Sequence, residues 1–256
     1  MYICNKFQEN QQGHIKYNHS KKVFKDKKVI TILDLLNFYK SFEPGIKETT
    51  LNWRIYTLVQ MGVLNRIGRG KYVIGVNNPY IPEISKSFKT LNKKLTSNFP
   101  YLDCCIWNTS VFNEFMLHQP FKFYNLVEVE KEAMESVFFF MKENKYSVFI
   151  EPDLDTLYKY TPEDKETWIV KSLVTEAPIQ EISGIKTATI EKMLVDIFCD
   201  PITFNTQQES EKDQIFKEAF NKYTINENTI LRYANRRRKK KELDKYLNRV
   251  SKFRQQ

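Results

Sequence analysis

The spacing of apolar residues in the first third of the chain predicts two consecutive helices, at residues 31–40 and 49–61. A Pro-Gly pair separates them. Thr31 can cap the first helix, and Thr49 or Thr50 can start the second, because a hydroxyl oxygen accepts an unpaired backbone N–H of the first turn. The residues expected to face the core are Ile32, Leu35, Leu36 and Tyr39 in the first helix and Leu51, Ile55, Leu58 and Val59 in the second.

A two-stranded hairpin is predicted directly after the second helix. Gly62 ends that helix, because glycine adopts the left-handed conformation at low steric cost. Two short apolar-rich runs, residues 63–67 and 71–74, then flank a Gly-Arg-Gly tip that suits a tight turn. Two helices followed by a basic hairpin is the order of a winged helix-turn-helix, and we place its first helix at residues 15–25.

The polar side of the second helix and the hairpin tip carry the residues that we expect to contact DNA. Threonine, asparagine and glutamine can hydrogen-bond base edges, whereas arginine and lysine contact phosphates. An exposed indole usually marks a contact, so Trp53 and Tyr56 are expected to meet a partner or another part of the chain. A winged helix that binds protein through Trp53 is therefore an alternative. The expected base-reading residues are Thr49, Thr50, Asn52, Thr57 and Gln60, and the expected phosphate contacts are Arg66, Arg69 and Lys71.

Beyond a proline-containing break at residues 77–82, the pattern alternates between strands and helices. An amphipathic helix is expected at 82–97, and a segment containing only helices at 208–256. The sequence therefore predicts an α/β (α+β) protein, with a winged helix-turn-helix domain at 1–78 and a mixed-sheet α/β domain at 82–256. The expected strands are 101–107, 121–130, 146–150 and 168–174, and the other expected helices are 111–117, 132–143 and 189–199.

The net charge of +9 is distributed unevenly along the chain. Residues 1–85 hold 13 Lys/Arg and 6 Asp/Glu, and residues 236–256 hold 10 and 2. The segment between them holds 17 Lys/Arg and 23 Asp/Glu, a net charge of −6. Basic ends on an acidic body indicate a polyanionic partner such as double-stranded DNA.

The basic run near the C-terminus is a candidate second basic patch. Two interpretations stay open: a basic helix that contacts nucleic acid, and a helix docked on the chain's own acidic body with its basic face in solvent. The run comprises Arg236, Arg237, Arg238, Lys239, Lys240 and Lys241, and the apolar seam that follows comprises Leu243, Tyr246, Leu247 and Val250.

Composition narrows the classes of function. The chain holds no run of about 18 apolar residues and begins without the apolar segment of a signal peptide, so we expect no membrane partner and a cytoplasmic location. The cysteines at 4, 104, 105 and 199 form no Cys-x-x-Cys pair, which predicts neither a zinc site nor a disulfide framework. We therefore expect no metal and no cofactor.

A metal-dependent nuclease is the enzymatic alternative, since an α/β body beside a DNA-binding head suits that activity. Such a site needs an acidic residue on one strand and an acid-x-Lys pattern on the next, so that a metal is held and a base is placed. Asp103 lies on a suitable strand, but the next strand carries Glu128 and Glu130 followed by Lys131. That lysine falls on the wrong strand face, so no catalytic residue is predicted.

The head, the strand–helix body and residues 185–200 resemble the AbiEi antitoxins of type IV toxin–antitoxin systems. In that family a winged-helix domain precedes an α/β domain with the pattern hydrophobic-x-E-x-x-L-x-D, which Glu191, Leu194 and Asp196 fill here. The head matches the family pattern at Leu58, Gly62, Val63, Leu64, Gly68, Arg69, Gly70 and Tyr72.

This resemblance implies a function that the residue patterns alone do not give. The head would bind inverted repeats in its own promoter and repress transcription. The body would counter a nucleotidyltransferase-type toxin without forming a tight complex with it, and the protein would not be an enzyme.

Overall fold

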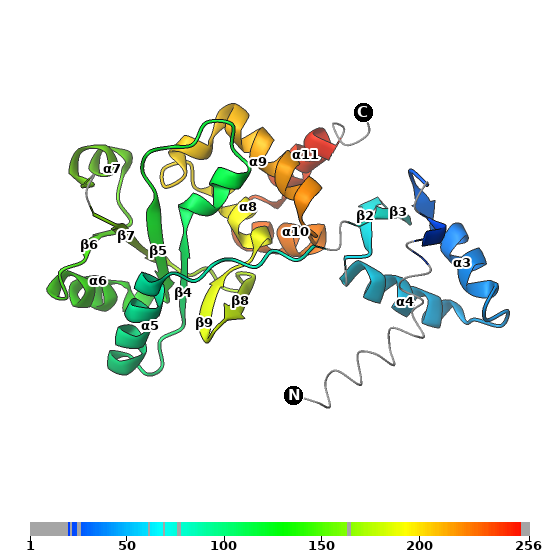
Figure 1. The fold of residues 1–256 in the computed structure, drawn as a ribbon, viewed down its shortest axis with the longest axis horizontal. Helices are drawn as coiled ribbons and strands as arrows, with labels where there is room; N and C mark the ends of the chain where they lie inside the picture. Colours follow the sequence, from blue (N-terminus) through cyan, green and yellow to red (C-terminus); the bar gives the residue numbers. More distant parts are fainter. Residues whose placement is uncertain are drawn as a thin grey trace. The chain divides into compact units, whose positions relative to one another are not determined.

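The protein was analysed as a computed structural model, and its chain divides into two compact units (Figure 1). The first unit takes in the described residues up to Pro79 together with Phe220–Glu227. The second comprises Tyr80–Ala219 and the chain from Asn228 onward. The sequence had placed residues 220–227 in the second domain, and the structure corrects this. The structure describes residues 20, 22–24, 27–60, 62–68, 70–75, 78–162 and 165–251.

From β1 onward, the first unit has the element order of a winged helix-turn-helix, whereas most of the first helix predicted at residues 15–25 lies outside the described residues. Strand β1 (Ile30–Thr31) leads into helix α3 (Ile32–Lys40), and helix α4 (Glu48–Gln60) follows. The hairpin of β2 (Leu64–Gly68) and β3 (Lys71–Ile74) comes last. All three strands form one antiparallel sheet in the order β1-β3-β2, so the hairpin is anchored to the strand that precedes α3.

A reciprocal cap fixes the start of α3. The Asp34 N–H donates to Thr31 Oγ1 (3.2 Å), and the Thr31 N–H donates to Asp34 Oδ2 (2.8 Å). The hydrogen bond from Lys27, with those from Thr31, lowers the pKa of Asp34 to about 2. The predicted cap at Thr31 is therefore confirmed, and its acidic partner was not foreseen.

Helix α4 begins one residue earlier than predicted. Because Glu48 is its first residue, Thr49 and Thr50 both lie inside the first turn instead of preceding it. Gly62 follows the helix with φ +68°, in the left-handed region that was predicted for it.

Helices α3 and α4 pack their apolar sides into one core with the sheet. Ile32 was predicted to belong to this core but is 42% exposed. Its N–H donates to the Gly70 carbonyl (3.2 Å), which holds it beside the hairpin, and Phe38 is buried in the core instead. The buried members of the core are Phe24, Ile30, Leu35, Phe38, Tyr39, Ile46, Leu51, Ile55, Leu58, Val63, Leu64 and Tyr72.

The second unit contains a mixed four-stranded sheet in the order β4-β5-β7-β6. Strand β4 (Cys104–Asn108) runs antiparallel to β5 (Tyr124–Val129). Strand β7 (Thr167–Ser172) runs parallel to both β5 and β6 (Ser147–Ile150). With the C-terminal helices described below, this sheet confirms the predicted α/β class.

Helices cover both faces of this sheet. Helices α5 (Lys86–Asn98) and α6 (Met134–Glu143) share one apolar cluster with alternate residues of β4 and β5. The remaining residues of β4 and β5 alternate with these and point to the opposite face of the sheet, where helix α8 (Ile190–Cys199) contacts them. The core of the second unit therefore lies on both sides of the strands.

The structure adds elements that the sequence did not predict. These are helix α7 (Leu154–Tyr160) and the antiparallel hairpin of β8 (Ile179–Ile182) and β9 (Ile185–Ala188). Asp153 caps α7 by accepting the Thr156 N–H (2.8 Å). The short helix predicted at residues 111–117 is a 3-10 helix at Thr109–Glu114.

Three helices follow: α9 (Glu209–Lys222), α10 (Glu227–Arg236) and α11 (Lys240–Ser251). None of the helices that the structure describes combines the length and the apolar character needed to cross a membrane. The turn between α9 and α10 belongs to the first unit and is joined to Asn78 by two hydrogen bonds. The Asn78 N–H donates to Thr224 Oγ1 (3.0 Å), and the Thr224 N–H donates to the Asn78 carbonyl (2.8 Å).

Candidate nucleic-acid interface

Helix α4 has one buried side and one exposed side. Leu51, Ile55 and Leu58 are buried, as the apolar spacing predicted. On the opposite side, Trp53 is 47% exposed and Tyr56 is 62% exposed. These two aromatic rings stand among polar side chains, so the exposed side of α4 combines large flat surfaces with hydrogen-bonding groups.

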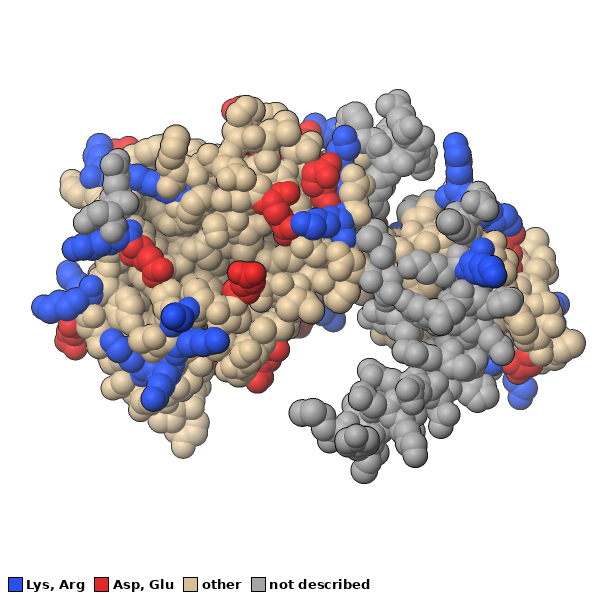
Figure 2. Space-filling view, viewed as in Figure 1, with Lys and Arg blue, Asp and Glu red and all other residues tan. Residues whose placement is uncertain are grey.

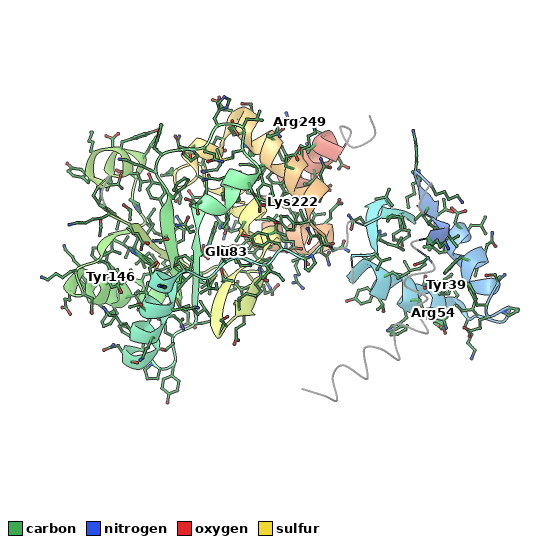
Figure 3. All side chains as sticks on the ribbon, viewed as in Figure 1. Tyr39, Arg54, Glu83, Tyr146, Lys222 and Arg249 are labelled. Carbon is green, nitrogen blue, oxygen red and sulfur yellow. The ribbon has the colours of Figure 1, made fainter. Side chains whose placement is uncertain are left out.

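A buried arginine fixes α4 against α3. Arg54 is only 8% exposed, and its guanidinium donates to a Glu43 carboxylate oxygen at 2.7 Å. It also lies over the Tyr39 ring, 5.0 Å from the centroid (Figure 3). Burial raises the pKa of Tyr39 to about 12. The buried position of Arg54 was not predicted, although Arg54 lies on the same side of the helix as the apolar Leu51, and this position indicated it.

The predicted base-reading residues separate into three groups. Thr49 and Asn52 are exposed on α4, as their role requires, and Thr50 is half-buried. The Thr57 hydroxyl donates to the Trp53 carbonyl (2.9 Å), so its proton is already used within the helix. The side chain of Gln60 lies outside the described residues. Thr49 and Asn52 are therefore the best-placed hydrogen-bonding groups on this helix.

The hairpin places two of its three predicted phosphate contacts on the surface. Arg66 on β2 and Lys71 on β3 are both exposed. Arg69 lies outside the described residues. Gly70 has φ +68°, which confirms that the tip needs a glycine in the left-handed conformation. The register between β2 and β3 shifts between Arg66 and Gly68.

The C-terminal basic run does not form one basic helix, contrary to the prediction. Helix α10 ends at Arg236, Arg238 has φ +58°, and α11 begins at Lys240, so the run spans a break. The apolar seam predicted after it is buried. Arg236 pairs with Glu176, Arg237 pairs with Asp196 (2.7 Å) and Lys239 pairs with Glu242 (3.1 Å), whereas Lys240 and Lys241 are exposed.

A group of buried charges lies in the second unit, between α8 and the sheet. The fully buried amine of Lys192 is 2.5 Å from a carboxylate oxygen of Glu128 and 2.5 Å from one of Asp196. Trp107 Nε1 also donates to Glu128 (3.0 Å). Burial by itself lowers the pKa of Lys192. The negative charges of Asp196 and Glu128 raise the pKa by more than burial lowers it, so the amine is charged.

The C-terminal helices complete this ion network. The hydroxyl of Tyr233 on α10 donates to Asp196 (3.0 Å), and the Arg237 guanidinium donates to the same oxygen (2.7 Å). Two residues of the AbiEi-like pattern, Leu194 and Asp196, are buried, and Glu191 is half-buried. In this chain the pattern therefore contributes mainly to the core of the second unit.

The residues weighed for a nuclease are each paired with a different lysine. Asp103, which directly precedes β4, pairs with Lys186 (2.5 Å), whereas the buried Glu128 pairs with Lys192 (2.5 Å). Among the described residues, three or more His, Cys, Asp or Glu side chains nowhere gather as a metal site would require.

Comparison with known proteins places the chain in a family. The model of a family described as "Family of unknown function (DUF6577)" matches residues 50–252. The match begins in the first turn of α4 and continues past α11, so it covers α4 from Thr50 onward, the hairpin and all the described residues of the second unit. No curated protein matches the chain.

Proposed function

We propose that this chain, which belongs to the DUF6577 family, is a sequence-specific double-stranded DNA-binding protein that represses its own promoter. In this proposal α4 enters the major groove, and the hairpin of β2 and β3 lies along the phosphate backbone. The observation that supports it best is the exposed side of α4, which presents Thr49 and Asn52 while Arg54 holds the helix from beneath.

The chemistry of these side chains suits the two parts of a DNA contact. An asparagine can form two hydrogen bonds to an adenine edge, which distinguishes that base from the others. Arg66 and Lys71 are exposed cations on the hairpin, and phosphate contacts of this kind position a protein without reading sequence. The exposed Tyr56 hydroxyl is a further group able to reach a phosphate.

The antitoxin part of the proposal rests on the resemblance to AbiEi. It adds inverted repeats as the DNA target and a nucleotidyltransferase-type toxin as the activity that the second unit counters. Because Asp196 and Leu194 are buried, we expect them to support the fold and other residues to act on the toxin pathway. The proposal contains no catalytic step, so the protein is a regulator and not an enzyme.

We expect Asn52→Ala to reduce binding to the chain's own upstream DNA about 10- to 100-fold, since a good pair of hydrogen bonds to a base gives about 1–3 kcal/mol of discrimination. Binding to an unrelated duplex should stay unchanged. Fluorescence anisotropy with both duplexes measures this. Lys71→Ala is the contrasting variant: it should weaken both duplexes equally and make the salt dependence shallower by about one unit of slope.

Two outcomes would count against the proposal. If Asn52→Ala keeps the full preference for upstream DNA, α4 does not read the sequence. If Lys71→Ala leaves affinity and salt slope unchanged, the hairpin does not contact phosphate.

A protein-interaction role is the second candidate, and the exposure of Trp53 and Tyr56 favours it. In that case Trp53→Ala abolishes capture of the partner, while wild-type protein gives no gel shift with upstream DNA at low salt. A clear shift that Trp53→Ala leaves intact would exclude an aromatic anchor as the main role of α4.

A further inference from the structure

One helix of the second unit carries a stripe of lysines that the proposed function does not use. Lys86, Lys89 and Lys93 of α5 are exposed, and their spacing puts them within about 60° on one side of the helix. The opposite side carries Phe88, Leu91 and Leu95 and is buried. We call the three lysines the basic face of α5. Figure 2 shows Lys and Arg side chains gathered over this region of the molecule.

Within the described part of the chain, no acidic side chain forms an ion pair with the three lysines of the basic face, although Glu166 accepts a hydrogen bond from the neighbouring Ser87 (3.3 Å). Helix α5 itself contains no Asp or Glu. The segment from 86 to 235 is acidic overall, with a net charge of −6, so the positive charge of α5 is opposite in sign to that of the segment that contains it.

The lysines are also placed where helix electrostatics disfavours them. The positive end of the helix dipole favours acidic residues in the first turn. Every other α-helix that the structure describes has an acidic residue there, whereas the first turn of α5 has none and begins at Lys86. Lys89 and Lys93 are four residues apart, a spacing at which like charges repel. A bound polyanion would relieve both effects.

Neighbouring lysines extend the same positive region. Lys94 donates to Asn144 Oδ1 (3.2 Å) and lies 5.1 Å from the centroid of the Tyr146 ring (Tyr146 is labelled in Figure 3), which ties α5 to the turn after α6. Lys142 and Lys145, at the end of α6 and in that turn, are both exposed. The positive surface therefore covers adjacent parts of α5 and α6.

We infer that the basic face of α5 binds the phosphate backbone of a nucleic-acid duplex, as a second contact surface separate from α4. The stripe from Lys86 to Lys93 spans about 10 Å. Double-stranded DNA presents one phosphate charge per about 1.7 Å of its axis, so roughly six phosphates fall within that length. The contact reads charge and not sequence, since lysine ammonium groups act as point charges on phosphate.

The composition of the face favours a nucleic acid over a protein or a membrane. Protein interfaces are depleted in lysine and enriched in aromatic residues at their centres, and the outward side of α5 carries lysine, threonine and serine. A helix that binds lipid inserts an apolar side, but the apolar side of α5 is buried in the core of the second unit.

The test uses the full-length protein with Lys89→Gln and Lys93→Gln combined, which removes two charges without adding new ones. The matched control combines Lys217→Gln on α9 with Lys245→Gln on α11, two exposed lysines that form no ion pair among the described residues. The measurement is the affinity for an unrelated duplex across a series of salt concentrations. Circular dichroism melting confirms that both variants stay folded.

We expect the α5 variant to make the slope of log affinity against log salt shallower by about 1.8, since each lost phosphate contact contributes about 0.9. The control pair should keep the wild-type slope. Identical slopes for the two variants, or no wild-type binding to duplex at low salt, would overturn the inference. The inference would also be overturned if the α5 variant lost binding to phosphatidylserine vesicles while its binding to the duplex stayed intact.

The outcome is independent of the proposal for α4. Base reading is tested by the preference for upstream DNA over an unrelated duplex, and the basic face of α5 by the salt slope on the unrelated duplex alone. Either result can fail while the other holds.

Discussion

Lys192→Met is expected to lower the free energy of unfolding of the second unit by about 3–5 kcal/mol, the range found when one partner of a buried ion pair is removed. Methionine keeps the length of the side chain but removes the charge that balances Glu128 and Asp196. Asp196 retains Arg237 and Tyr233, whereas Glu128 retains only the Trp107 N–H within the described part of the chain. Glu128 would therefore be left buried with an uncompensated charge.

Urea unfolding followed by tryptophan fluorescence measures this loss, because Trp107 and Trp168 are both buried in the second unit. The matched control is Lys186→Met. Lys186 forms an ion pair of the same 2.5 Å length with Asp103, but its side chain is 46% exposed, so the change should be no more than about 1 kcal/mol.

A neutral partner should rescue the first variant in part. Adding Glu128→Gln to Lys192→Met removes the unbalanced charge and keeps an oxygen that accepts the Trp107 N–H. Equal losses in Lys192→Met and Lys186→Met would show that the buried network contributes no more to stability than a surface pair.

Gly62→Ala should give the second largest loss of stability, lowering the free energy of unfolding of the first unit by about 2–5 kcal/mol. Gly62 has φ +68°, and a side chain in that conformation costs about 1–2 kcal/mol. A β-carbon there would also overlap the side chain of Thr224, and overpacking adds about 1–3 kcal/mol. Hydrogen exchange of the α4 and β3 amides measures the stability of this unit separately from the second.

The control for this prediction is Gly45→Ala, since nothing lies within 4 Å of the β-carbon it would introduce. Its effect should be close to zero or slightly stabilising. Combining Gly62→Ala with Thr224→Ala should destabilise less than the sum of the single changes, because Thr224→Ala removes the atoms that overlap most. Strict additivity would mean that the turn between α9 and α10 does not pack on Gly62.

The elements of the first unit were predictable because local spacing encodes them. The cap at Thr31, the buried positions of α4 and the left-handed Gly62 each depend on residues a few positions apart. Strands and helices of the second unit followed from the same periodicity. Helix α7 and the hairpin of β8 and β9 were missed, because each is short and carries little apolar periodicity.

For the candidate interface, the sequence named the side chains but not their surroundings. Exposed Thr49, Asn52 and Lys71 agree with the predicted positions, while Thr57 uses its hydroxyl proton within the helix. Whether an arginine is buried depends on its partners, and Arg54 finds Glu43 and Tyr39 only after α3 and α4 have packed.

By itself, the sequence determined most of the helices and strands, the winged helix-turn-helix class and the basic character of the hairpin, since these follow from local spacing and composition. Only the tertiary structure decided which charges are buried and which segments join. Asp196 meets Arg237 from 41 positions away, and Asn78 meets Thr224 from 146 positions away. Such contacts leave no local pattern, because the two partners lie far apart in the sequence and meet only when the chain folds.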